Sequence, residues 1–123
     1  MYKRQPLFFG KYKQAYIFGL PGNPASTLTC FYLYAFPMLR SYYNHPTPHL
    51  IDTQRKLKNN FKVKGDRPQF LKAYCDGHNI TVLPNQSSSM IHGFNNANCL
   101  AFFEEGNKEV ISKTTIKTIL LPI

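Results

Sequence analysis

The chain has 123 residues, of which 43% are hydrophobic, and it carries a formal net charge of +9. This length suits one ordinary domain or two small lobes, and the apolar content predicts a globular protein with a buried core. No run approaches the roughly 18 to 20 apolar residues that a membrane helix needs, and the N-terminal residues lack the apolar stretch of a signal peptide. These features exclude a membrane partner and predict a soluble, cytoplasmic protein.

The basic charge is concentrated near the start of the chain. The first 49 residues contain no acidic residue and five basic residues, namely Lys3, Arg4, Lys11, Lys13 and Arg40. A basic surface of this kind attracts the phosphates of a nucleic acid or of a small anionic ligand. Solubilising surface charge is the simpler interpretation.

Residues 15 to 20 form a short apolar run between turn residues, which is typical of a buried strand in an α/β layer. In the turn that follows, Asn23 is placed to cap a helix whose first residue is Pro24. Apolar residues at helical spacing from Ala25 to about Tyr43 predict a helix that faces a core. Pro37 is expected to bend or interrupt its last turns, because proline removes a backbone donor and crowds the preceding turn.

Two prolines, Pro46 and Pro48, favour extended chain and mark a boundary between two lobes. A strand and a helix cannot cover both of their own faces, so residues 1–45 are expected to be the incomplete C-terminal part of a larger α/β domain. Residues 46–123 are expected to form the second domain.

The second lobe shows the signals of short strands separated by turns. Five strands are expected, at roughly 50–60, 68–75, 79–83, 99–103 and 115–121. Asp76-Gly77-His78 is a good hairpin turn between the second and third of them. Five short strands suggest a small closed barrel, because closure removes exposed edges. A short helical turn is expected from Ser87 to Phe94.

The cysteines and histidines do not indicate a metal site. Cys30, Cys75 and Cys99 are far apart and odd in number, so we expect reduced core residues and neither a disulfide framework nor a CxxC motif. The four histidines lack a carboxylate or a cysteine at ligand spacing, which argues against zinc.

The segment from Phe18 to Ser26, FGLPGNPAS, is the most specific signal in the chain. A strand leads into a Gly/Pro turn and a helix start, where backbone N–H groups lack helical partners. Such a helix start binds anions readily. A rigid connection between strand and helix, without a ligand, is the alternative.

This segment resembles the GLPGNPxS motif of the molybdopterin molybdenumtransferase family, which includes bacterial molybdopterin biosynthesis protein A and the E domain of gephyrin. Other segments are similar to further family motifs in the same order. They are residues 5–11 (KPGKPLxFG in the family), 31–40 (FELFVRPALR), 65–72 (GRxxFxR), 83–90 (QSSxM) and 96–100 (ADGL). The resemblance spans the chain from residue 5 to about 121. One departure is that Tyr2-Lys3-Arg4-Gln5-Pro6 lacks the glycine of the KPGKP loop.

The resemblance implies an α+β fragment of a longer protein, in which the terminal strand and helix of an α/β molybdopterin-binding domain precede a small all-β barrel. It implies the insertion of molybdate into adenylylated molybdopterin with release of AMP, assisted by Mg²⁺. The acidic groups that handle the cation lie in upstream parts of the family. We therefore expect no catalytic or metal-ligating residue here, no activity of the fragment alone, and a homodimer for the full-length protein.

The resemblance also implies a set of residues that bind the anionic substrates. They are Gly19, Pro21, Gly22, Asn23, Pro24 and Ser26 around the helix start, Arg67 at the entry to a barrel strand, and Ser87 and Ser88 in the QSSxM turn. An oxyanion needs a cation and oriented donors, and arginine provides a planar fork of donors. The alternatives are that Ser26 serves only the first helical turn, Arg67 is solvated surface, and Ser88 caps a turn.

A non-catalytic basic β-barrel module that binds nucleic acid or a protein partner is the alternative function. The net charge and a small barrel would suit an oligonucleotide-binding fold. Such a surface needs exposed aromatic side chains, whereas the barrel aromatics are expected in the core. These are Phe61, Phe70, Tyr74, Phe102 and Phe103, so nucleic acid is disfavoured as a partner. Nothing in the sequence selects a protein-anchoring role.

Overall fold

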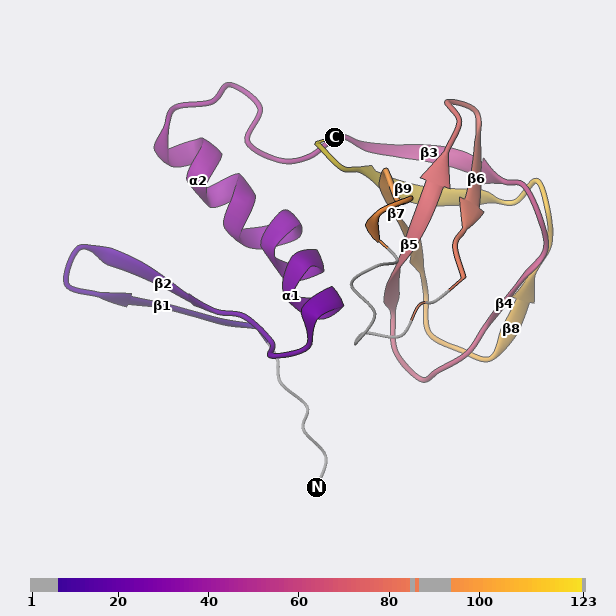
Figure 1. Ribbon diagram of the computed structural model, residues 1–123, viewed down its shortest axis with the longest axis horizontal. Coiled ribbons are helices and arrows are strands. Elements are labelled where there is room, and N and C mark those ends of the chain that lie inside the picture. Colours follow the sequence, from indigo (N-terminus) through magenta and orange to yellow (C-terminus); the bar gives the residue numbers. More distant parts are fainter. Residues whose placement is uncertain (1–6, 85, 87–93, 123) are drawn as a thin grey trace. The chain divides into compact units, whose positions relative to one another are not determined.

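The computed structural model describes residues 7–84, 86 and 94–122, which fall into two compact units that meet in sequence between His49 and Leu50 (Figure 1). The first unit contains strands β1 (Phe8–Tyr12) and β2 (Ala15–Gly19) and one long helix. The second unit contains the remaining strands. None of the helices in the described ranges is long and apolar enough to cross a membrane.

The first two strands form an antiparallel hairpin that turns at Lys13, whose φ is 53°. The predicted strand at 15–20 is therefore present, but it pairs with the preceding segment and it is not buried. Tyr16 is 50% exposed and Ile17 is 44% exposed. The physical reason is that a two-stranded ribbon has two faces, and this unit offers only one helix to cover them.

The long helix runs through three consecutive segments, α1 (Pro24–Cys30), a π-helical segment η1 (Phe31–Ala35) and α2 (Phe36–Tyr42). It confirms the helix predicted from the apolar spacing. Of the two effects expected of Pro37, a bend or an interruption, the interruption is not observed, because the helix continues through it. The N–H of Phe36 donates to the carbonyl of Phe31, five residues back, so a wider turn stands directly before the proline and accommodates its ring.

The helix start differs from the prediction in one detail. Asn23 occupies the N-cap position with extended backbone, but its side chain makes no capping hydrogen bond. The carbonyl of Asn23 instead accepts two bonds from Thr27, one from the backbone N–H at 2.8 Å and one from the hydroxyl at 2.9 Å. Thr27, one turn into the helix, thus holds the backbone of Asn23, the residue predicted as the N-cap.

The second unit is a closed five-stranded barrel, as predicted, and its strands follow the order β3-β6-β5-β7-β9 (Figure 1). Its strands are β3 (Asp52–Leu57), β5 (Gln69–Cys75), β6 (Asn79–Val82), β7 (Cys99–Phe103) and β9 (Thr115–Leu120). All neighbouring pairs are antiparallel except β3 and β6, which run parallel. The barrel and its core lie entirely in residues after Leu50, which confirms the α+β fold class.

Two further strands, β4 (Phe61–Val63) and β8 (Lys108–Val110), form a small antiparallel sheet that the sequence did not predict. Three residues are too few to show alternation of apolar and polar side chains. Val63 and Val110 are buried in the main core, and the ring of Phe61 lies 5.2 Å from that of Phe103. The small sheet therefore closes one side of the barrel core.

The hairpin turn predicted at Asp76-Gly77-His78 is present between β5 and β6. The Asp76 carboxylate accepts hydrogen bonds from the backbone N–H groups of Asn79 at 2.8 Å and His78 at 3.1 Å. Gly77 adopts a φ of 104°, which favours glycine. These two bonds hold the pKa of the Asp76 carboxyl below its ordinary value.

The expectations for individual core residues are met only in part. Cys75 and Cys99 are buried and free, whereas Cys30 is only half-buried. Phe103 is buried and Phe61 packs against the core, but Tyr74 is 49% exposed because it lies on the outward-facing row of β5. The helical turn expected at Ser87–Phe94 lies, up to residue 93, outside the described residues.

Candidate functional site

Gly19 ends strand β2 at a point where no larger residue fits without rearrangement. It lies opposite Phe8 in the hairpin, and a Cβ added to it would lie 2.9 Å from the Cβ of Phe8. Phe8 therefore packs directly over the glycine, and the chain leaves the hairpin from this point toward the helix. The glycine of the predicted anion-binding motif is thus explained by close packing.

The turn from Pro21 to Pro24 is fixed by Thr27 on the first turn of the helix. The Thr27 hydroxyl donates to the carbonyl of Pro21 as well as to that of Asn23. Gly22, Asn23 and Pro24 are exposed, while Ala25 is buried and anchors the helix start. A rigid, solvent-facing turn is the arrangement that a binding loop needs.

Ser26 follows this turn and is half-buried. Its hydroxyl makes no hydrogen bond with the described part of the chain. The Ser26 hydroxyl is therefore not occupied by the first helical turn. The Ser26 hydroxyl and the backbone N–H groups at the helix start are therefore hydrogen-bond donors that lie within one short segment of the chain.

Arg67 lies in the loop between β4 and β5 in the second unit and is exposed. Within the described ranges it has no hydrogen bond and no ion pair. The backbone around it is fixed, because Gly65 donates to the side chain of Asn107 at 3.0 Å and accepts from the N–H of Gly106 at 3.1 Å. A fixed loop thus presents an unpaired guanidinium to solvent.

Ser87 and Ser88 lie outside the described residues, but the chain on both sides of them is anchored at Lys72 in β5. The Gln86 amide bonds both backbone groups of Lys72, and the Lys72 ammonium lies 5.6 Å from the ring of Phe94. Lys72 is only 3% exposed, and this burial lowers the pKa of its ammonium. Lys72 and Gln86 lie in the segments 65–72 and 83–90 that resemble family motifs, but no sequence signal predicts their contact.

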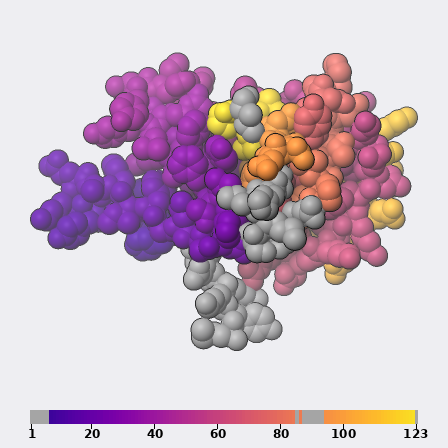
Figure 2. All heavy atoms as spheres, in the orientation of Figure 1, coloured from indigo at the N-terminus to yellow at the C-terminus, as the bar shows by residue number. Residues whose placement is uncertain are grey.

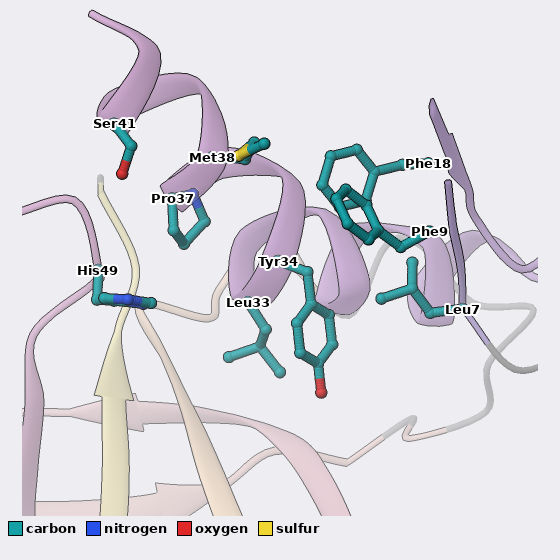
Figure 3. A pocket seen from close by; sticks show the side chains of 9 residues that line it. All are labelled: Leu7, Phe9, Phe18, Leu33, Tyr34, Pro37, Met38, Ser41 and His49. Carbon is teal, nitrogen blue, oxygen red and sulfur yellow. The ribbon is translucent and has the colours of Figure 1, made fainter. Parts of the chain in front are cut away.

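The structure brings together the predicted residues from Gly19 to Ser26 in the first unit, and it places Arg67 in the second. None of these lines the apolar groove of the first unit, which has a volume of about 440 Å³ (Figure 3). Its lining comes from both hairpin strands and from one face of the helix, and it includes Phe9, Phe18, Leu33, Tyr34, Pro37 and Met38. A groove of this composition does not suit an oxyanion.

A metal site is not visible in the parts of the chain that the structure describes. Within those residues no group of three His, Cys, Asp or Glu side chains could hold a metal ion.

Comparisons with known proteins agree with the motifs. Residues 54–121 match the family of the MoeA C-terminal region (domain IV). The chain is 37% identical over 71 residues to the molybdenum cofactor synthesis protein cinnamon of Drosophila melanogaster, which corresponds to 56% of this chain and 12% of that protein.

Two solved structures of a molybdopterin biosynthesis moeA protein from Pyrococcus horikoshii share the fold. The first has a TM-score of 0.72 and 26% sequence identity and covers 94% of this chain. The second has a TM-score of 0.62 and 16% sequence identity and covers 91% of this chain. The chain spans only 28% of either. Because the family match covers more than half of the sequence and most of the barrel, the chain belongs to the MoeA C-terminal region (domain IV) family.

Proposed function

We propose that this chain is the C-terminal part of a molybdenum-cofactor biosynthesis enzyme that inserts molybdate into adenylylated molybdopterin and releases AMP. The family match of the barrel and the names of the Drosophila and Pyrococcus relatives support this proposal. Since the chain spans 12% and 28% of those relatives, the activity belongs to a longer protein that includes this region. That protein is proposed to act in the cytoplasm as a homodimer.

At the level of residues, the proposal rests on the exposure of Arg67 and on the absence of an ion pair to it within the described residues. Molybdate and the phosphate of the pterin are anions, and a guanidinium binds an oxyanion through paired N–H donors. Arg67 is exposed on a loop with a fixed backbone, and no carboxylate in the described residues competes for it. Its side chain can therefore exchange water for an anionic substrate without first breaking an internal ion pair.

The helix start of the first unit is proposed to supply the neutral donors. The Ser26 hydroxyl and the backbone N–H groups of Ala25 and Ser26 are the proposed donors, next to a turn held by Thr27. Hydroxyl and amide donors at a helix start orient a bound oxyanion. Gly19, Pro21, Gly22 and Pro24 shape this turn, and Ser87 and Ser88 are proposed to add hydroxyls. In this scheme the chain binds and orients substrates, and the cation is handled by upstream residues.

The test uses a full-length protein that contains this region. Arg67→Ala should lower the rate of molybdate insertion by about tenfold or more, as expected for the loss of one charge-assisted contact. Lys108→Ala, which removes an exposed cation from β8, is the matched control and should leave the rate unchanged. Unchanged insertion in Arg67→Ala, with normal folding of both variants, would exclude Arg67 from the site. The isolated 123 residues should show no turnover.

One observation favours a second candidate, a non-catalytic module that binds single-stranded nucleic acid. The hairpin carries lysines beside exposed aromatic rings, with Lys11 5.3 Å from the ring of Tyr16 and Lys13 5.5 Å from that of Tyr12. In Figure 2 the side chains of the hairpin, coloured indigo, lie open on the visible face. Filter binding of single-stranded DNA at two salt concentrations tests it, because phosphate neutralisation predicts a steep loss of affinity with salt.

A further inference from the structure

The pairing between β3 and β6 is the shortest strand pairing in the barrel. It consists of two residue pairs, Lys56 with Asn79 and Leu57 with Ile80. On its other side β3 pairs with β9 from Asp52 to Lys56, so Gln54 and Arg55 have a neighbouring strand on one side only. A hollow of about 390 Å³ lies here, and we call it the seam hollow. It is lined by Gln54, Arg55, Lys56, Gly77, His78, Asn79 and Thr115.

Arg55 is an unusual residue for its place in the barrel. Side chains alternate along β3, and Arg55 belongs to the more buried row with Thr53 and Leu57. Its Nη1 donates to the Thr53 hydroxyl at 2.8 Å and to the Gln54 carbonyl at 2.9 Å. Its Nε is buried and has no hydrogen-bond partner in the described residues. Nη1 uses both of its hydrogens in these two bonds and Nε is not accessible to solvent, so Nη2 is the group of the guanidinium that remains available to a ligand.

The charge of Arg55 also has no counter-ion among the residues that the structure describes. The one ion pair found within the described residues joins Lys117 to Asp52, at 3.4 Å. Cys99 lies near enough to interact electrostatically with Arg55, but burial raises the pKa of this thiol to about 12, with a further contribution from Cys75 that outweighs the effect of the arginine. Cys99 is thus a neutral thiol at physiological pH. A partly buried cation without a compensating anion is costly, and a bound anion would relieve that cost.

The other lining residues add positive charge and neutral donors. Lys56, on the exposed row of β3, and His78 are exposed and line the hollow, and Asn79, Gln54 and Thr115 bring amide and hydroxyl groups. No carboxylate lines the seam hollow. The nearest in sequence, Asp76, accepts the backbone N–H groups of His78 and Asn79 and is thereby held to its own turn.

We propose that the seam hollow binds a small tetrahedral oxyanion of the phosphate class, with Arg55 as the principal cation and Lys56 and His78 at the rim. The guanidinium and the lysine ammonium together match the charge of a doubly charged anion, and the imidazole adds a ring nitrogen for hydrogen bonding. The ligand is either free phosphate or the phosphate of a phosphomonoester, which share this group. The site uses none of the residues assigned above to molybdopterin and molybdate, so the two proposals can fail separately.

Isothermal titration calorimetry of the 123-residue chain, with inorganic phosphate in one arm and AMP in the other, tests this inference. We expect saturable binding at one site in at least one arm. Arg55→Ala should weaken binding by at least about tenfold, as expected for the loss of a charge-assisted hydrogen bond. Lys56→Gln and His78→Gln should each weaken it by a smaller factor. Lys108→Ala removes an equal charge from β8, outside the hollow, and should leave the affinity unchanged.

Binding in both arms identifies the phosphate group itself as the ligand, and binding of AMP alone identifies a phosphomonoester. The absence of saturable binding in both arms overturns the proposal. Equal weakening by Lys108→Ala and Arg55→Ala overturns it too, because the attraction would then be a diffuse effect of net charge. If Arg55→Ala does not fold, the double variant Lys56→Gln/His78→Gln decides, and an unchanged affinity in that variant refutes the site.

Discussion

Gln86 binds the backbone of Lys72 as a neighbouring strand would. Its Oε1 accepts the Lys72 N–H at 3.0 Å, and its Nε2 donates to the Lys72 carbonyl at 2.8 Å and to the Leu83 carbonyl at 2.6 Å. A single side chain therefore pairs with both polar backbone groups of a buried residue in β5, whose carbonyl also accepts from the N–H of Leu83 at 3.0 Å. Since buried backbone groups are costly to leave unpaired, Gln86 fixes where the chain after β6 leaves the barrel.

Replacing Gln86 should therefore destabilise the second unit. Gln86→Ala removes three hydrogen bonds and leaves the Lys72 backbone without that partner, so we expect a loss of about 1–3 kcal/mol in the free energy of unfolding. Urea denaturation followed by circular dichroism measures it. Gln14→Ala, at an exposed glutamine in the hairpin turn, is the control and should have an effect near zero. Equal stability of the two variants would show that the Gln86 bonds do not hold the barrel.

Burial of Lys72 should make stability depend on pH in the alkaline range. Its pKa is lowered in the folded protein by desolvation, so the unfolded chain binds more protons between the folded pKa and the ordinary value of 10.5. Stability from this residue is therefore greatest above the unfolded pKa and falls as pH decreases through the folded value. Wild-type protein should gain stability between neutral pH and about pH 10.

Lys72→Met should lack this gain, and Lys62→Met, at an exposed lysine on β4, should keep it. The difference between the two variants is the informative measurement, because other lysines and tyrosines titrate in the same range. Urea midpoints at several pH values give that difference. Parallel pH profiles for wild type and Lys72→Met would refute the assignment of the shift to Lys72.

The features that the sequence predicted are those encoded by local signals. The five barrel strands are bounded by turn residues, and the Asp76-Gly77 pair marks its hairpin without any knowledge of the rest of the fold. The helix follows from apolar spacing alone. The motif from Gly19 to Ser26 likewise folds as a strand, a turn and a helix start, as its residues indicate.

The features that sequence reasoning missed depend on partners far along the chain. Strands β4 and β8 are three residues each and exist because they pair with one another across 45 positions or more, as in Val63 with Lys108. The wide turn before Pro37 replaces an expected interruption, because the helix can widen by one residue where a ring would clash. The sequence does not mark Arg55 as a binding residue. Its position on the inward row of β3 is unusual for a cation, but this row can be identified only once the register of the barrel strands is known.

The carboxylate of Asp76 should contribute to resistance against acid. Its pKa lies below the ordinary value of 3.8 because Asn79 and His78 donate their backbone N–H groups to the charged form. This stability is present above the unfolded pKa and is lost as pH falls through the folded value. Asp76→Asn, which keeps an acceptor but no charge, should unfold with a smaller dependence on pH between about 5 and 2. Asp66→Asn is the control, and an identical acid profile for the two variants would contradict the role of Asp76.

Gly10 and Gly19 of the hairpin can be compared directly, because a Cβ added at each would contact a different part of Phe8. A Cβ at Gly19 would lie 2.9 Å from the Cβ of Phe8, which is fixed to the backbone, whereas a Cβ at Gly10 would lie 2.9 Å from the Cζ at the free end of the same ring. A ring end can swing aside at small cost, but a Cβ moves only with its strand. Gly19→Ala should therefore separate the strands, and Gly10→Ala should not.

Amide hydrogen exchange by NMR measures this difference directly. We expect the amides that form the β1–β2 ladder next to the Phe8–Gly19 pair to exchange at least about tenfold faster in Gly19→Ala, which corresponds to a local loss of about 1–2 kcal/mol. In Gly10→Ala those rates should stay near the wild-type values. Because the turn that begins at Pro21 starts from this pair, a separated hairpin should also release the exposed loop from Gly22 to Pro24. Equal exchange in both variants would mean that Phe8 does not pack over Gly19 in solution.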